Sequence, residues 1–375
     1  MAFHLLPGNT IGIMSDDLTG QTLAQHAHDM GFNVAGFSEF PDAPVLSEAD
    51  EAFIGQEQLE EFKAKSDVIT YTAPWLSPDL IDQLQGTVLP QGLDLVSITG
   101  DHAISRAFNE AYAVNILPYR IATSLDDVEE SGRILGYPVV VKPIFKHKHH
   151  DETVILHGMW DLGLVAPMVD GGTMLVENWL DPVREFSVTA VRSEQGDVQA
   201  FPIRETKKQM QHLRQAWTVD DLDADLIEAI QDVLTRISTA LDYVGAFSVN
   251  FFFSAEGNLY VRDVLPGLHA TDGVYEGITS ISVAQQHLRA ITGQPLQTIK
   301  QFGAAMYLPV TARERTSVIW NWGIQDTWSV NLYRNPGTAL KIGHVNIIGS
   351  NTNDLLQKVS ATQVWNIDKD EEDSE

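Results

Sequence analysis

The chain has 375 residues, of which 44% are hydrophobic and 20% charged, and its formal net charge is −27. This length predicts two or three domains of ordinary globular composition. Nucleic acid and anionic membranes are not expected partners, because both require clustered Lys and Arg. The absence of cysteine excludes disulfides and thiol chemistry and is compatible with a cytoplasmic protein.

The two ends of the chain carry no targeting pattern. The first residues lack a basic segment followed by an apolar stretch, so we expect no signal peptide. No apolar run approaches the roughly 18 residues that a bilayer-spanning helix needs. Residues 368–375 form a charge run that predicts a disordered acidic tail.

The first hundred residues alternate short apolar strands with helices. This alternation is typical of a doubly wound parallel sheet. The expected strands are 10–14, 33–37 and 67–71, and the expected helices are 21–31 and 78–84. The pattern predicts an N-terminal α/β domain over residues 1–100.

The rest of the chain is mixed and then becomes strand-rich after Gly293-Gln294-Pro295. The expected helices are 101–113, 220–241 and 282–291. The expected strands are 138–142, 173–177, 186–191, 246–253, 258–261, 304–308, 330–333 and 344–348. We expect a second domain over 101–295, a C-terminal one over 296–365 and the tail over 366–375.

Residues 176–180 (Val-Glu-Asn-Trp-Leu) carry the most informative pattern, together with the strand that begins at Arg184. They are interpreted as an exposed edge running into a strand, with Glu177 and Glu185 separated by an apolar wall. Backbone groups at 177–180 could meet an adenine edge, and Glu185 could accept from ribose hydroxyls. A plain strand end fits the same residues, so the motif alone leaves both interpretations open.

Basic residues and a hairpin suggest where phosphates and a metal would bind. Lys142 ends an apolar strand and is either a phosphate ligand or a surface lysine with a buried stem. Residues 146–150 (Lys-His-Lys-His-His) fit a metal tract, a phosphate-covering loop or a solvated hairpin tip. Asn250 and Asp263 lie on an expected hairpin and could place two oxygen ligands near one Mg²⁺, although one carboxylate with an amide is a poorer cage than two carboxylates. Neither a Walker nor a Rossmann glycine motif is present.

Together these segments resemble the ATP-grasp superfamily, and more closely its N5-carboxyaminoimidazole ribonucleotide synthetase family of purine biosynthesis. The likeness runs from about Ile11 to Lys358 and includes 135–142, 176–188 and 286–296. It implies an ATP-grasp fold with an N-terminal doubly wound parallel-sheet domain and a small strand-rich C-terminal domain. It also implies a cytoplasmic homodimer that uses ATP and Mg²⁺ to join bicarbonate to 5-aminoimidazole ribonucleotide through carboxyphosphate.

The resemblance assigns roles by position. It places ATP binding at His102, Arg106, Lys142, Glu177, Asn178, Trp179, Leu180, Glu185 and Lys208. It places Mg²⁺ binding at Asn250 and Asp263, and substrate binding at His269 and Lys341. It assigns no catalytic residue.

Several positions depart from the family pattern. Asn250 stands in place of a glutamate, and Arg262-Asp263 in place of Asn-Glu. Asp16 and Asp17 stand in a turn that is glycine-rich in the family, where they either repel a substrate phosphate or cap a helix beginning near Leu18. Three functions therefore stay open: the family's synthetase, a ligase for a non-phosphorylated acceptor, or a non-catalytic paralogue that binds a nucleotide or a partner.

Overall fold

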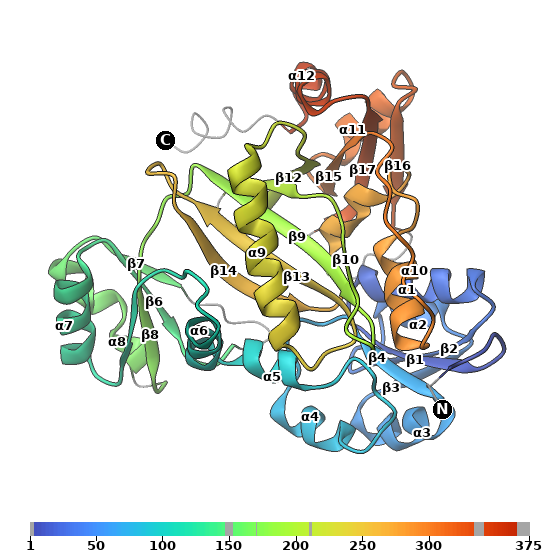
Figure 1. Cartoon of the computed structure of the whole chain (residues 1–375), viewed down its shortest axis with the longest axis horizontal. Helices are drawn as coiled ribbons and strands as arrows, with labels where there is room; N and C mark the ends of the chain where they lie inside the picture. Colours follow the sequence, from blue (N-terminus) through green and yellow to red (C-terminus); the bar gives the residue numbers. More distant parts are fainter. Residues whose placement is uncertain (1–3, 147–152, 170, 210–211, 334–340, 366–375) are drawn as a thin grey trace.

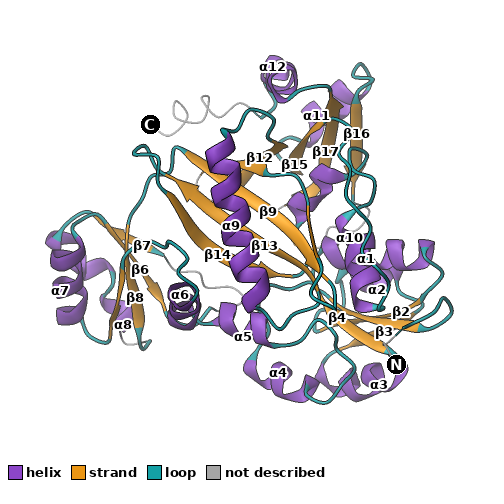
Figure 2. Ribbon diagram, in the orientation of Figure 1, coloured by secondary structure: helices purple, strands orange, loops and turns teal. Residues whose placement is uncertain are grey.

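The computed structural model describes residues 4–146, 153–169, 171–209, 212–333 and 341–365. Over these ranges the chain forms three sheets with helices packed around them (Figures 1 and 2). The expected acidic tail and most of the Lys/His tract lie outside the described residues. Within the described ranges, no helix has the length and apolar character needed to cross a bilayer.

The first sheet has the expected parallel, doubly wound architecture. Its strand order is β3 (Glu51–Ile54), β2 (Asn33–Ser38), β1 (Thr10–Met14) and β4 (Val68–Tyr71), with every pair parallel. Its helices are α1 (Leu18–Asp29), α2 (Pro44–Glu48), α3 (Leu59–Lys65) and α4 (Pro78–Leu84). Ile11 and Ile13 pack with Leu23 of α1, while Gly12 faces Phe62 of α3, so both faces of β1 are covered. Two-sided burial explains why these strands are apolar throughout.

A small antiparallel sheet lies apart from the first (Figure 1). Its order is β5 (Tyr119–Ala122), β8 (Met174–Asn178), β6 (Val139–Pro143) and β7 (Val154–Leu156). Helices α7 (Leu125–Leu135) and α8 (Ala166–Val169) pack against it. Helices α5 (Asp94–Gly100) and α6 (His102–Ala111) lead into it from the first sheet.

The third sheet is antiparallel and forms the centre of the molecule. It contains β9 (Arg184–Arg192), β10 (Val198–Ala200), β11 (Arg204–Gln209), β12 (His212–Thr218), β13 (Gly245–Phe253), β14 (Leu259–Pro266), β15 (Ala304–Thr311), β16 (Trp328–Leu332) and β17 (Lys341–Gly349). Helix α9 (Ala224–Ala240) crosses one face (Figure 2). Strand β15 pairs with β12, so the C-terminal strands extend this same sheet.

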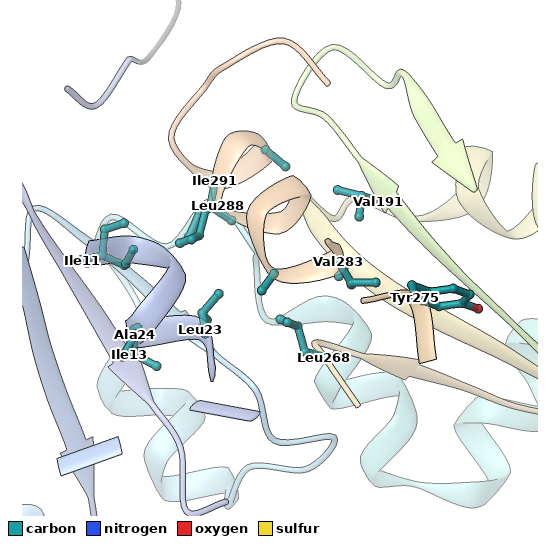
Figure 3. Close-up of a cluster of buried hydrophobic side chains, with 14 of the residues drawn as sticks. Ile11, Ile13, Leu23, Ala24, Val191, Leu268, Tyr275, Val283, Leu288 and Ile291 are labelled. Carbon is teal, nitrogen blue, oxygen red and sulfur yellow. The ribbon is translucent and has the colours of Figure 1, made fainter. Parts of the chain in front are cut away.

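Helix α10 (Val283–Ile291) joins the first sheet to the third. In Figure 3, Leu288 and Ile291 of α10 lie against Ile11 of β1, and Leu268 lies near Leu23 of α1. His287, on the same helix, accepts a hydrogen bond from the Ala246 N–H and lies 2.8 Å from the Thr70 hydroxyl. These contacts hold the start of α1 opposite the 3-10 helix η3 (Ala270–Tyr275).

Two expected helix starts differ from those observed. Helix α1 begins at Leu18, three residues before the expected helix 21–31, because Asp17 caps it as the capping alternative required. Helix α9 begins later, at Ala224, after Asp223. Further helices and strands were not predicted from the sequence: α2, β3, α3, α5, β5, α7, β7, α8, β10, β11, β12, α11 (Arg315–Trp322) and α12 (Thr352–Thr362).

Candidate functional site

Glu177 is buried between two cations. Strand β8 lies inside its sheet between β5 and β6, and Glu177 is only 5% exposed. Arg106 of α6 binds one carboxylate oxygen at 2.6 Å, and Lys142 of β6 binds the other at 3.0 Å. The expectation of an exposed edge is therefore wrong, because β5 pairs along the other side of β8. Lys142 is likewise not a surface lysine: burial lowers its pKa, and Glu177 acts in the opposite direction.

The segment after β8 changes from internal hydrogen bonding to a free backbone. The Asn178 N–H donates to the Pro118 carbonyl, and the Trp179 N–H donates to the Pro138 carbonyl. Leu180 makes no backbone hydrogen bond to any described residue. Its peptide groups are therefore available to the edge of a planar polar ligand, as expected for an adenine contact.

Leu180 opens onto a cavity of about 680 Å³ beside β9, β11 and β13. This volume is within the usual range for small-molecule sites. Trp179, Trp217 and Phe252 supply apolar lining, and Glu185 supplies a carboxylate. Glu185 accepts from Lys208 at 2.6 Å and from Arg262 at 3.1 Å. The cavity thus combines an apolar wall, a free backbone edge and a charged end.

Asn250 and Asp263 meet as predicted, but they bind each other. They are register partners on β13 and β14, and the Asn250 side-chain amide donates to one Asp263 oxygen. The Arg262 Nε donates to the other oxygen at 2.6 Å. Burial alone would raise the pKa of Asp263, but Arg262, Lys146 and the Asn250 hydrogen bond hold it well below its usual range.

This arrangement does not fit a magnesium site. Mg²⁺ prefers one or two free carboxylates within a near-octahedral set of oxygens. Both Asp263 oxygens already have donors, and a guanidinium stands beside them. No group of three or more His, Asp or Glu side chains suited to a metal occurs within the described ranges.

His102 lies at the first residue of α6, in the cationic corner of the site. Burial, with Lys142, Lys146 and Arg106 nearby, lowers its pKa to about 2, so its imidazole is neutral at physiological pH. Arg106 also donates to the backbone carbonyl of Arg262 at 2.9 Å. The group around Glu177 therefore adjoins the group around Glu185, and the structure brings the residues assigned to ATP into one region.

The residues assigned to substrate lie near a second cleft, on the side of α1. Its lining includes Thr19, His269, Glu276, Tyr333 and His344, from four separate parts of the chain. The His269 Nε2 is buried and has no hydrogen-bond partner among the described residues. Burial lowers the pKa of His269, while Asp272, Asp263 and Asp17 act in the opposite direction.

Lys341 begins β17, the strand that also carries His344 of this cleft. Burial lowers the pKa of Lys341, and Asp17 acts in the opposite direction. The Tyr333 hydroxyl lies 2.7 Å from the His344 Nδ1. Burial lowers the pKa of His344 to about 4, and it raises the pKa of Glu276. The polar side chains that line the cleft thus include neutral rings, such as those of His344 and Tyr333, and the carboxyl group of Glu276.

The two aspartates after β1 point to different places. Asp17 caps α1 by accepting from the Thr19 N–H at 3.0 Å, so the capping alternative holds for this residue. Asp16 instead accepts from the Ser38 hydroxyl and lines a separate cavity with Trp75. The expectation that both carboxylates oppose one bound phosphate is therefore wrong for Asp16, because its side chain turns toward β2.

A buried ion pair beneath the cleft was not found from the sequence. Arg204 of β11 binds Asp272 of η3 at 2.6 Å, and both also contact Thr189. The pair joins the third sheet to the segment that carries His269. No local signal marks Arg204, since it stands in a polar stretch. His344, by contrast, lies three residues after Lys341, to which the resemblance assigned substrate binding.

The chain is similar to known proteins over nearly its whole length. An ATP-grasp domain model matches residues 107–284. The N5-carboxyaminoimidazole ribonucleotide synthase of Staphylococcus haemolyticus is 27% identical over 92% of this chain and 94% of its own. That of Staphylococcus saprophyticus is 24% identical over 94% and 96%.

Solved structures share the fold over nearly the whole chain. An ADP complex of N5-carboxyaminoimidazole ribonucleotide synthetase has a TM-score of 0.91 at 23% identity, covering 97% of this chain and 99% of its own. The Aspergillus clavatus N5-carboxyaminoimidazole synthase with ADP and 5-aminoimidazole ribonucleotide has a TM-score of 0.83 at 15% identity, covering 95% and 98%. Residues 107–284 carry an ATP-grasp domain, and the chain is similar over nearly its whole length to N5-carboxyaminoimidazole ribonucleotide synthases.

Proposed function

We propose that this protein joins bicarbonate to 5-aminoimidazole ribonucleotide with cleavage of ATP. The observation that carries the proposal is similarity over nearly the full length of synthases named for this reaction. The Aspergillus clavatus relative holds both ADP and 5-aminoimidazole ribonucleotide, which supports a nucleotide site and an acceptor site in one chain.

The cavity beside Leu180 is the proposed ATP site. The adenine edge would meet the free Leu180 backbone, with Trp179 and Phe252 against the ring faces. The ribose hydroxyls would donate to Glu185, which Lys208 orients from 2.6 Å. The phosphates would then extend toward Arg262, Arg106 and Lys142, where a polyanion meets fixed positive charge.

In the proposed reaction, a bicarbonate oxygen attacks the γ-phosphorus and ADP leaves, giving carboxyphosphate. The amine of the acceptor then attacks the carbonyl carbon, phosphate leaves and the amine loses a proton. His269 lines the cleft on the α1 side, and its buried Nε2, which has no hydrogen-bond partner among the described residues, can hydrogen-bond a reactant there. Arginine and lysine near the transferred phosphoryl group would stabilise its developing charge. Mg²⁺, as expected from the resemblance, would supply more, but Asn250 and Asp263 are not arranged to hold it.

A second candidate is a ligase that acts on a non-phosphorylated acceptor. The observation that favours it is the charge of the cleft on the α1 side. Among its described lining residues there is no Lys or Arg, whereas Glu276 faces it and Asp17 stands at its edge. An acceptor phosphate would have to rely on Lys341 and on the free N–H groups at the start of α1.

Release of ADP distinguishes these functions. We expect turnover only when ATP, bicarbonate and 5-aminoimidazole ribonucleotide are all present, with one ADP formed per product. Hydrolysis with bicarbonate that the ribonucleotide does not stimulate would favour the other acceptor. Nucleotide binding without any hydrolysis would instead favour a non-catalytic paralogue. Sedimentation in the same buffer tests the homodimer, which we also propose from the family resemblance.

A further inference from the structure

Arg262 stands where the nucleotide cavity meets the β13–β14 hairpin. Its Nε binds Asp263 at 2.6 Å, its Nη1 binds Glu185 at 3.1 Å, and its guanidinium carbon lies 5.6 Å from the centre of the Phe252 ring. Its side chain is 28% exposed and lines the cavity. Arg262 is thus fixed by two carboxylates and one ring but still reaches the space that a ligand would occupy.

Part of the guanidinium remains available. An arginine has five N–H donors in one rigid plane. Two of these are used by Asp263 and Glu185, and the Nη2 has no hydrogen bond to the parts of the chain that the structure describes. A planar fork with free N–H groups matches the oxygens of a phosphate.

The same contacts leave no place for a divalent cation. A metal on Asp263 would have to displace the Arg262 Nε or the Asn250 amide. It would then lie within a few ångström of a guanidinium that Glu185 also holds, and like charges at that range repel. The hairpin therefore favours its own arginine over a metal.

The charged residues around the cavity leave a small positive surplus. Arg106, Lys142, Lys208 and Arg262 are paired with Glu177, Glu185 and Asp263, which leaves one positive charge in surplus. The other charged lining residues are two cations and two anions, which cancel: Arg184, Lys207, Asp181 and Glu205. The chain as a whole has a net charge of −27, so a positive surplus at one cavity stands out. Binding of an anionic ligand in the cavity explains this surplus.

We propose that Arg262 is a built-in counter-ion that binds the nucleotide phosphates in place of a protein-held metal, so that nucleotide binds without Mg²⁺. The proposal rests on the ATP site of the proposed function, but it does not depend on turnover or on the acceptor. It makes Arg262 a determinant of which form of the nucleotide the site accepts, the free polyanion or its metal chelate.

The test is calorimetric titration of the full chain with ADP, first in EDTA and then in excess MgCl₂. We expect the Kd for ADP in EDTA to be within about twofold of the Kd in Mg²⁺, or lower. The reason is that Mg²⁺ bound to ADP reduces the negative charge of the phosphates that Arg262 would contact. Binding that Mg²⁺ strengthens about tenfold or more would overturn the inference and leave the proposed function intact. Absence of ADP binding in both buffers would overturn both. Metal-free binding without turnover would contradict only the function.

Variants separate a ligand-binding role from a structural one. Arg262→Gln should weaken ADP binding in EDTA about tenfold, and Arg262→Lys should recover part of that loss because it keeps the charge. Asn250→Glu with Arg262→Asn should make binding depend on Mg²⁺, since it provides a second carboxylate and removes the guanidinium.

Arg236→Gln is the control. It removes an arginine that pairs with Asp232 on the surface of α9 and should leave the Kd for ADP unchanged. An Arg262→Gln protein that keeps its melting temperature and binds ADP like the wild type would contradict the inference.

Discussion

At the scale of single residues, the partner of a carboxylate decides what the carboxylate can do. Glu177 is buried and has both oxygens bound by cations, so it fixes the positions of Arg106 and Lys142. Glu185 is also paired, but it lies at the wall of the cavity. The sequence predicted both residues as part of one pocket. It could not distinguish their roles, because the partners Arg106, Lys208 and Arg262 stand 71, 23 and 77 residues away.

Replacing Glu185 with Ala tests the ribose contact. The substitution removes the acceptor for the ribose hydroxyls and leaves Lys208 and Arg262 without their carboxylate. We expect binding of both adenosine and ADP to weaken by about 1–3 kcal/mol, the usual cost of leaving buried polar groups unpaired. Calorimetric titration measures both ligands.

Comparison of the two ligands identifies the cause. An equal loss for adenosine and ADP indicates the ribose contact they share, whereas a change confined to ADP would show that Glu185 acts only through its cations. Glu194→Ala, in the exposed turn after β9, is the matched control and should bind both ligands normally. Wild-type affinity in Glu185→Ala would show that the cavity is not the nucleotide site.

At the scale of elements, local patterns predicted the strands whose apolar residues form the cores. The β13–β14 hairpin was expected, and its register does place Asn250 opposite Asp263. Strands β11 and β12 were missed because polar residues such as Lys207 and Gln215 interrupt their apolar pattern. Pairing of Ala216 with Tyr307 joins strands about ninety residues apart, which no local pattern can indicate. The position of β8 within its sheet was missed for the same reason.

Asp17 shows how one side chain can serve both its own helix and a neighbouring cleft. It caps α1, and it also acts on Lys341 and His269 across the cleft. Asp17→Asn keeps a good N-cap but removes the charge, so α1 should keep its stability. Affinity for 5-aminoimidazole ribonucleotide should increase about fivefold, or roughly 1 kcal/mol, since Asp17 is exposed and water screens its repulsion of a phosphate.

The neighbouring aspartate provides the control. Asp16 turns toward Ser38 and a different cavity, so Asp16→Asn should leave affinity for the ribonucleotide unchanged. Equal effects of the two substitutions would contradict the different orientations of these side chains. Tight binding by the wild type with no gain in Asp17→Asn would mean that Asp17 acts only as a helix cap. Both variants can be titrated with the same ligand under the same conditions.

At the scale of the whole molecule, the site depends on how the first sheet is held against the third. Residues of β1 and α10 form the apolar junction (Figure 3). One chain of polar side chains runs through it. Thr70 of β4 donates to Gln91, and His287 of α10 lies between Thr70 and the Ala246 N–H. The junction positions the start of α1 beside His269, so the cleft on the α1 side depends on this packing.

The junction should make stability depend on pH. Burial lowers the pKa of His287 from 6.5 to about 3, so the unfolded chain binds one more proton than the folded chain between these values. This contribution to stability is complete above pH 6.5 and is lost as the pH falls toward 3. Between pH 7.5 and 5.5, we expect the free energy of unfolding to fall by about 1.3 kcal/mol because of His287 alone. His287→Gln cannot ionise and should lose that part of the pH dependence, measured by urea unfolding at both pH values.

His102 and His344 remain in the variant and act in the same direction, so the difference between the two proteins isolates His287. NMR titration of the wild type gives an independent check, since protonation of His287 in the folded protein above pH 5 would contradict its burial.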